Sequence, residues 1–224
     1  MILSLKLKGS MRGYAECSMF QEVGLRSRTD WTPEVDVRIA NPPPALLAKY
    51  TVKEKTFYYD YASFVVRLIQ SETVTGRIHH VVSTERIATD RPVDIRVMVF
   101  PARTFRGRQN RILHGSYSQS ASQISLYPLR IPKDWIREEG IDLFRTGLES
   151  RSQRKLRALY EISESAVSTV IHEILHVKFQ QRSMSRYGEE ALVRKLERQF
   201  MLGWEDWILV PVQQALALTK GNPS

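Results

Sequence analysis

The sequence predicts a mixed fold of the α+β class, because helix-like and strand-like patterns occupy separate stretches of the chain. Between residues 93 and 127, apolar and polar side chains tend to alternate, as they do in half-buried strands. Between 163 and 180, and again between 188 and 202, apolar side chains recur at the three- and four-residue spacing of helices. The 224 residues are 42% hydrophobic and 25% charged, which is enough for one core or one core plus a small satellite.

The first ninety residues carry no recognisable motif, and their role is open. Residues 2–8 alternate like a strand, and the run Asn41-Pro42-Pro43-Pro44 predicts a break in regular structure. Asp60 is predicted to cap a helix that Gly76 ends, with apolar side chains at helical spacing at Tyr61, Phe64, Val65, Leu68 and Ile69. We expect residues 1–90 to form an α/β region that packs on the same core as a domain at 91–224.

Strand patterns follow from residue 93 onwards. Residues 93–100 alternate, and residues 112–117 and 123–127 are predicted to form a hairpin around Ser118-Gln119-Ser120-Ala121. The insert at 128–161 is expected to hold one or two short helices. Pro211 is predicted to begin a final helix that reaches about Lys220.

The run His172-Glu173-Ile174-Leu175-His176 is the most informative feature of the sequence. Histidines four residues apart on a helix lie on one face, where their imidazoles can bind one metal ion, and the glutamate between them can accept a proton from a metal-activated water. The predicted helix at about 163–180 is apolar around most of its circumference. Burying histidines and a carboxylate there is costly unless they are hydrogen-bonded or bind a metal.

A catalytic zinc site usually has three protein ligands, so a third is needed. No histidine follows His176, which leaves the carboxylates of the helix predicted at about 188–202. Glu189 falls in the centre of that helix's apolar stripe, formed by Leu192, Val193, Leu196 and Phe200, and is our predicted third ligand. Glu190, then Glu197, are the alternatives. An ordinary acidic helix N-terminus explains Glu189 and Glu190 equally well.

The HEILH run resembles the HExxH signature of the zinc metallopeptidases known as zincins. A glutamate on the following helix is similar to the gluzincin branch, and in particular to small prokaryotic and phage-type metallopeptidases. This resemblance implies a twisted mixed sheet whose edge strand lies over the active-site helix and binds extended peptide. Residues 123–127 resemble that edge strand in position and pattern. The resemblance also implies Zn²⁺ held by His172, His176 and Glu189, with Glu173 as the general base.

A further hydrogen-bond donor usually stabilises the oxyanion of such a reaction. Tyr187 and Tyr160 are candidates because they precede the predicted ligand and the site helix, and His114 is a weaker one. Each is also a common type of packing residue.

The net charge of +9 raises a second function class. Basic side chains cluster in two segments predicted as loops, Arg103, Arg106, Arg108 and Arg111 in the first and Arg145, Arg151, Arg154, Lys155 and Arg157 in the second. Neither matches a nucleic-acid-binding motif, and the first contains a single aromatic residue. A metallopeptidase with a protein or peptide substrate is therefore preferred. The alternatives are a zincin-fold metal-binding regulator without turnover, a basic nucleic-acid-associated protein, and a peptidase that acts on DNA-bound proteins.

The compartment is predicted from the cysteine count and the hydropathy of the chain. The lone Cys17 excludes an internal disulfide framework and fits a reducing compartment. The first eight residues lack the long apolar core of a signal peptide, and no apolar run is long enough for a transmembrane helix. We expect a cytoplasmic protein that does not bind membranes.

Overall fold

The computed structural model describes residues 35–87, 92–106, 109–179 and 185–217, all within one compact unit that spans 32–224. The strand expected at residues 2–8 and the single cysteine lie outside the described residues. Helices and strands both contribute, so the structure is of mixed helix and strand content, which is compatible with the predicted α+β class. Residues on either side of position 90 share one sheet, because β1 (Val35–Ala40) pairs with β2 (Val93–Met98).

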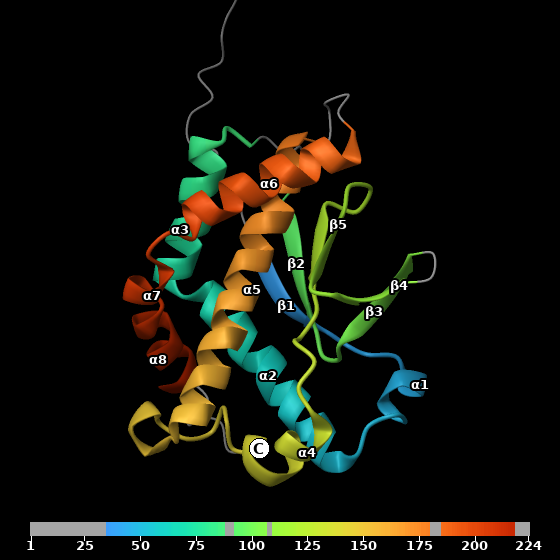
Figure 1. The fold of residues 1–224 in the computed structure, drawn as a ribbon, viewed down its shortest axis with the longest axis vertical. Coiled ribbons are helices and arrows are strands. Elements are labelled where there is room, and N and C mark those ends of the chain that lie inside the picture. Colours follow the sequence, from blue (N-terminus) through green and yellow to red (C-terminus); the bar gives the residue numbers. More distant parts are fainter. Residues whose placement is uncertain (1–34, 88–91, 107–108, 180–184, 218–224) are drawn as a thin grey trace, which may run out of the picture. The chain divides into compact units, whose positions relative to one another are not determined.

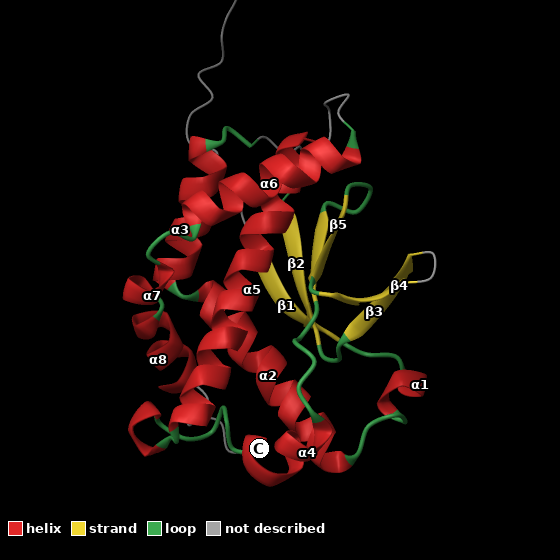
Figure 2. Ribbon diagram, in the orientation of Figure 1, coloured by secondary structure: helices red, strands yellow, loops and turns green. Residues whose placement is uncertain are grey.

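The main sheet has four strands in the order β1-β2-β6-β5. Strands β1, β2 and β6 (Gln123–Leu126) are parallel, and β5 (Gly115–Ser118) runs antiparallel to β6. Burial alternates along β2, as expected for a strand with one face against the core. The opposite face carries the ion-paired side chains Arg38, Asp94 and Arg96. The helices therefore cover one face of the sheet (Figure 2).

The prediction that residues 123–127 form the edge strand is wrong, because β6 lies inside the sheet between β2 and β5. The expected hairpin is present, with Gly115 opposite Leu126, and it places β5 at the edge instead. The first arginine-rich segment also differs from the prediction. It forms the paired strands β3 (Ala102–Arg106) and β4 (Gln109–Leu113) on either side of residues 107–108.

Two helices replace the single one predicted from Asp60 to Gly76. α2 (Val52–Gln70) starts nine residues before Tyr61, because Thr51 and Glu54 form a capping box. Asp60 lies inside α2 and pairs with Arg145 at 2.8 Å. α3 (Glu72–Thr84) begins after the cap Ser71 and contains Gly76 in its interior. The five apolar positions predicted for this region are all buried.

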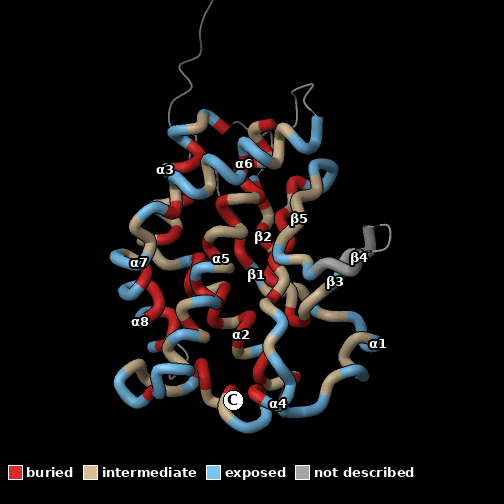
Figure 3. The backbone as a smooth tube through the Cα atoms, viewed as in Figure 1, coloured by how far each residue is buried: buried red, intermediate tan, exposed pale blue. Residues whose placement is uncertain are grey.

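The longest helix is α5 (Gln153–Phe179), which begins ten residues before the predicted start. It lies across the sheet beside α2 and contacts β5 and β6 (Figure 1). Buried residues follow both helices and the strands beneath them (Figure 3). α6 (Arg186–Phe200) crosses the C-terminal end of α5, as Figure 1 shows, and it confirms the second helix predicted at about 188–202.

Short elements complete the described chain. The break predicted at 41–44 is a loop at 41–43 before α1 (Pro44–Leu47). The insert at 128–161 holds α4 (Lys133–Trp135), a π-helical turn (Ile136–Gly140), a 3-10 turn (Leu148–Ser150) and the start of α5. α7 (Trp204–Trp207) precedes α8 (Leu209–Ala217), in which Pro211 is the third residue. Among the described helices, none is long and apolar enough to cross a bilayer.

Candidate metal centre

The two histidines of the HEILH run face each other on α5. One helical turn separates His172 from His176, and their Nε2 atoms are 3.1 Å apart. The two ring planes are inclined at 69°, with centroids 4.8 Å apart. The sequence spacing has therefore produced the shared face that was predicted from it.

The third member of the group comes from the first turns of α6, which Ser185 caps by accepting a hydrogen bond from the Gly188 N–H. The oxygens of Glu190 lie 3.8 Å from His172 Nε2 and 3.5 Å from His176 Nε2. These donor atoms all lie within 4.8 Å of one another.

The spacing of these atoms fits a tetrahedral metal ion. Ligand atoms at about 2.0–2.1 Å from zinc stand about 3.3–3.4 Å from one another in a tetrahedron. His176 Nε2 stands 3.1 Å from His172 Nε2 and 3.5 Å from Glu190 Oε2, which is close to that value, whereas His172 Nε2 is 3.8 Å from the other oxygen, Glu190 Oε1. Two imidazole nitrogens and one carboxylate oxygen also form a donor set typical of catalytic zinc, with room for a fourth ligand.

Two further carboxylates of α6 bind the other nitrogen of each ring. His172 Nδ1 is 2.8 Å from Glu197 Oε2, and His176 Nδ1 is 2.7 Å from Glu189 Oε1. An ionised carboxylate can only accept a hydrogen bond, so each Nδ1 must be the protonated, donating nitrogen. In a neutral imidazole this leaves Nε2 with a bare lone pair.

Two bare Nε2 lone pairs therefore point into the same small space beside a carboxylate. Such an arrangement is repulsive without a positive charge between the three groups, and either a proton shared by the two Nε2 atoms or a divalent cation would supply that charge. Carboxylate–histidine pairs that fix the tautomer of a metal-binding ring are a regular feature of zinc sites. The hydrogen bonds to Glu189 and Glu197 are thus a second feature, besides the HEILH spacing, that indicates a metal centre.

The electrostatics of the site favour positive charge on the His172 ring. Burial by itself would lower the pKa of His172, but the hydrogen bond to Glu197 and the charges of Glu197, Glu173 and Glu190 outweigh it, and the pKa is raised. Burial would likewise raise the pKa of Glu190, yet the Arg194 guanidinium, 2.7 Å away, and the two histidines lower it overall.

Glu173 lies on a different side of α5, against strand β5. It is 8% exposed, and burial raises the pKa of its carboxyl, partly opposed by the two histidines. Strand β5 approaches closely at Gly115, where an added Cβ would lie 2.8 Å from Glu173 Oε1 and 2.4 Å from Thr169 Cγ2. Glycine is required here by the close approach of strand and helix.

A cavity of about 700 Å³ opens beside the centre, between α5, α6 and the start of β5. His172, Glu173 and Glu190 line it, and α5 continues its wall through Thr169, Ser168, Ser165 and Glu164. His114 is the only one of the three predicted oxyanion donors that lines this cavity. Tyr160 packs against the core, and the side chain of Tyr187 is 87% exposed.

The structure differs from the sequence prediction in the role of Glu189. All three predicted glutamates reach the two rings, but Glu190 shares the space between the Nε2 atoms, whereas Glu189 and Glu197 bind the Nδ1 atoms. Sequence reasoning also gave no site role to Arg194, although its four-residue spacing from Glu190 was a usable signal.

Comparison of the chain with known protein families, with curated proteins and with solved structures gives no match.

Proposed function

We propose that this protein is a zinc-dependent metallopeptidase with a zincin-like fold. One observation carries the proposal: two imidazole Nε2 atoms, each left bare by a carboxylate on its Nδ1, converge with Glu190 on one point. His172, His176 and Glu190 would hold the ion. Zinc, when bound, would make a water molecule more acidic and polarise the carbonyl of the scissile bond.

Glu173 is the proposed general base. It follows His172 directly, lines the same cavity, and is buried beneath β5, away from the carboxylates that fix the rings. Its carboxylate takes a proton as water oxygen bonds to the carbonyl carbon, and returns the proton to the amine nitrogen as the carbon–nitrogen bond breaks. The raised pKa of Glu173 suits a group that must both accept and return a proton.

Strand β5 is the proposed binding surface for the substrate. It is the edge strand of the sheet on the side of the metal centre, and its Gly115 lies against Glu173. A free edge offers backbone hydrogen bonds that an extended peptide can use in any sequence. His114, the residue immediately before this strand, is the proposed donor to the oxyanion. We keep the cytoplasm as the proposed compartment, on the basis of the single cysteine.

The experiment compares zinc-loaded wild-type protein with Glu173→Gln on several unfolded protein substrates. The variant should bind zinc like the wild type but lose about 10²- to 10⁴-fold in rate, because the general base is removed and the ligands remain. Glu164→Gln is the matched control, since Glu164 lines the same cavity outside the metal group. Full activity in Glu173→Gln, or no cleavage by the zinc-loaded wild type, would refute the proposal.

A further inference from the structure

A second cavity, of about 580 Å³, lies between α1, the start of α2, the start of β3 and the segment that leads into α4. It shares no lining residue with the metal cleft. The two sites are nevertheless adjacent along the chain, since Leu129 lines the metal cleft and Arg130 lines the second cavity.

Four cations line this cavity, namely Lys49, Arg103, Arg130 and Lys133. The single acid among the lining residues is Glu54, which is 1% exposed. Its carboxylate accepts a hydrogen bond from the Thr51 N–H at 2.8 Å and lies 3.4 Å from Lys133 and from Arg137. Glu54 is thus already neutralised, and the cavity carries a surplus of positive charge.

Three of these cations are available to a ligand. Within the described part of the chain, no carboxylate lies within ion-pair distance of Lys49, Arg103 or Arg130. The second basic cluster of the sequence behaves differently, because Arg145, Arg154, Lys155 and Arg157 each pair with an acid. Unpaired cations around a concave surface indicate a site for an anion.

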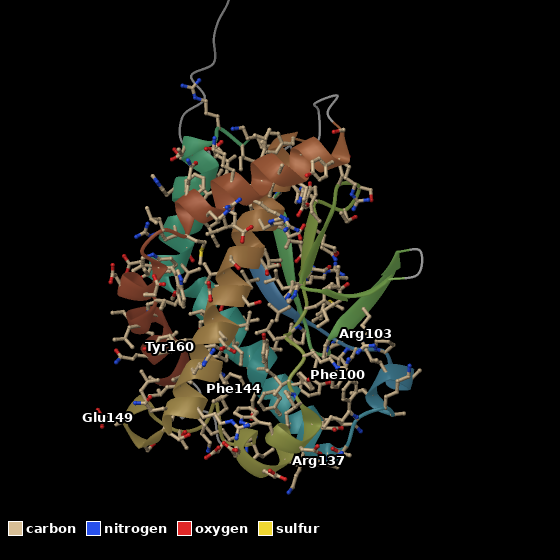
Figure 4. All side chains as sticks on the ribbon, viewed as in Figure 1. Phe100, Arg103, Arg137, Phe144, Glu149 and Tyr160 are labelled. Atoms are coloured by element: carbon tan, nitrogen blue, oxygen red, sulfur yellow. The ribbon has the colours of Figure 1, made fainter. Side chains whose placement is uncertain are left out.

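The rest of the wall is apolar and aromatic. Tyr50 stacks on Phe100 with centroids 4.0 Å apart and planes inclined at 10°, and Tyr58 packs against both rings. Ile112, with 45% of its surface exposed, and Ile131 also line the cavity. Figure 4 labels Phe100 and Arg103, which lie close together near α1. A ligand that fits must combine an anionic group with a planar or apolar one.

We propose that this second cavity binds a nucleoside phosphate, with the phosphate held by Arg103, Arg130 and Lys49 and the base placed against the Tyr50 wall. Guanidinium groups match phosphate oxygens in pairs, and aromatic side chains contact bases of any sequence. Phe100 stacks on Tyr50 and Lys133 Nζ lies 5.6 Å from the Tyr50 ring centroid, so the base would meet this wall beside Lys133. The cavity volume is in the range of small-ligand sites. The same chemistry is offered by a free nucleotide and by one unit of a single-stranded nucleic acid.

The test titrates the full chain with adenosine 5′-monophosphate, adenosine, inorganic phosphate and a single-stranded oligodeoxyadenylate of about twelve nucleotides. Adenosine monophosphate should bind more tightly than adenosine or phosphate alone, because it uses both the cations and the aromatic wall. The Arg103→Ala, Arg130→Ala double variant should bind at least about tenfold more weakly, since two charge-assisted contacts are removed. Arg157→Ala, a change at an 83% exposed side chain outside the cavity, is the matched control and should bind like the wild type.

The oligonucleotide identifies the source of the ligand. Much tighter binding than the mononucleotide, with a steep loss in salt, would assign a single-stranded nucleic acid, and equal binding would assign a free nucleotide. The proposal is overturned if no nucleotide binds, if the double variant binds like the wild type while melting at the same temperature, or if a polyglutamate peptide binds as tightly as the nucleotide. That last result would show unselective attraction of anions. None of these outcomes depends on peptidase activity.

Discussion

Each imidazole of the candidate metal centre has contacts at both of its nitrogens, and the three glutamates of α6 therefore fall into two roles. Nδ1 and Nε2 lie on opposite sides of a ring, so neighbouring residues such as Glu189 and Glu190 can contact different nitrogens of one histidine. The carboxylates on Nδ1 orient the rings, whereas the carboxylate beside Nε2 would contact the ion itself.

Removing these carboxylates one at a time should separate the two roles. Glu189→Ala and Glu197→Ala should each lower zinc affinity by about 10- to 100-fold, because the ring loses its orienting partner but remains a ligand. Glu190→Ala should lower the affinity further. Competition with a chromophoric chelator measures all three, and Glu164→Ala serves as the control. If Glu189→Ala has the largest effect instead, Glu189 is the third ligand, as the sequence alone suggested.

The sequence was sufficient to place His172, Glu173 and His176 in one site, since the helix geometry that relates them is local. It could not assign the third ligand, because helical periodicity only tells which face of α6 is apolar. The choice between Glu189 and Glu190 depends on how α6 crosses α5, and this crossing is set by packing far from either residue.

At the scale of elements, the approach of β5 to α5 determines where Glu173 lies. Gly115→Ala should reduce the free energy of unfolding by about 1–3 kcal/mol, because the new methyl group overlaps Thr169 and Glu173. It should also lower kcat/KM by about tenfold or more, since the carboxylate is displaced. Denaturant unfolding and peptidase assays measure the two effects.

Gly76 provides the matched control for that substitution. It lies inside α3, and nothing stands within 4 Å of an added Cβ. Gly76→Ala should therefore stabilise the protein by about 0.5–1 kcal/mol through helix propensity. A Gly115→Ala protein that is as stable and active as the wild type would contradict the close packing of β5 on α5.

The start of α2 should make stability depend on pH. Burial would raise the pKa of Glu54, but its hydrogen bonds with Thr51 and the charge of Lys133 outweigh it and lower the pKa overall. A carboxyl with a lowered folded-state pKa stabilises the fold above its unfolded pKa, and this contribution is lost as pH falls through the folded-state value. Glu54→Gln should therefore be less stable than the wild type at neutral pH, by about 1–3 kcal/mol.

The difference between wild type and Glu54→Gln should disappear in acid, below the usual pKa range of a glutamate. Urea unfolding at several pH values measures it. A difference that stays constant down to acid pH would show that the charge of Glu54 has no stabilising role.

Element starts and strand order were the parts of the fold that the sequence predicted least well. The helix predicted from the apolar spacing at 61–69 is confirmed, but its start was predicted at Asp60. The capping box of Thr51 and Glu54, which begins the helix, was not recognised in the sequence. The hairpin at β5 and β6 was correct as well, because turn residues are local. β5 is the edge strand because β6 pairs with β2. This pairing joins distant parts of the chain, so local sequence patterns do not predict it.

At the scale of the whole compact unit, the candidate metal centre is one of the places where α6 is joined to the core. α5 is buried along much of its length, whereas Val193 is the only fully buried side chain of α6. The ring–carboxylate contacts of Glu189, Glu190 and Glu197 therefore attach this helix to α5 together with the partly buried Leu196 and Phe200. Occupancy of the site and the position of α6 should be coupled, as metal binding and local folding often are.

Zinc titration of the purified chain by calorimetry, beside the His176→Ala variant, tests the central claim most directly. The geometry predicts one tightly bound ion in the wild type and none at this site in the variant, since the variant lacks one of the two converging Nε2 atoms. A wild-type chain that binds no divalent ion, or a variant that binds it equally well, would contradict the metal centre and the peptidase proposal that depends on it.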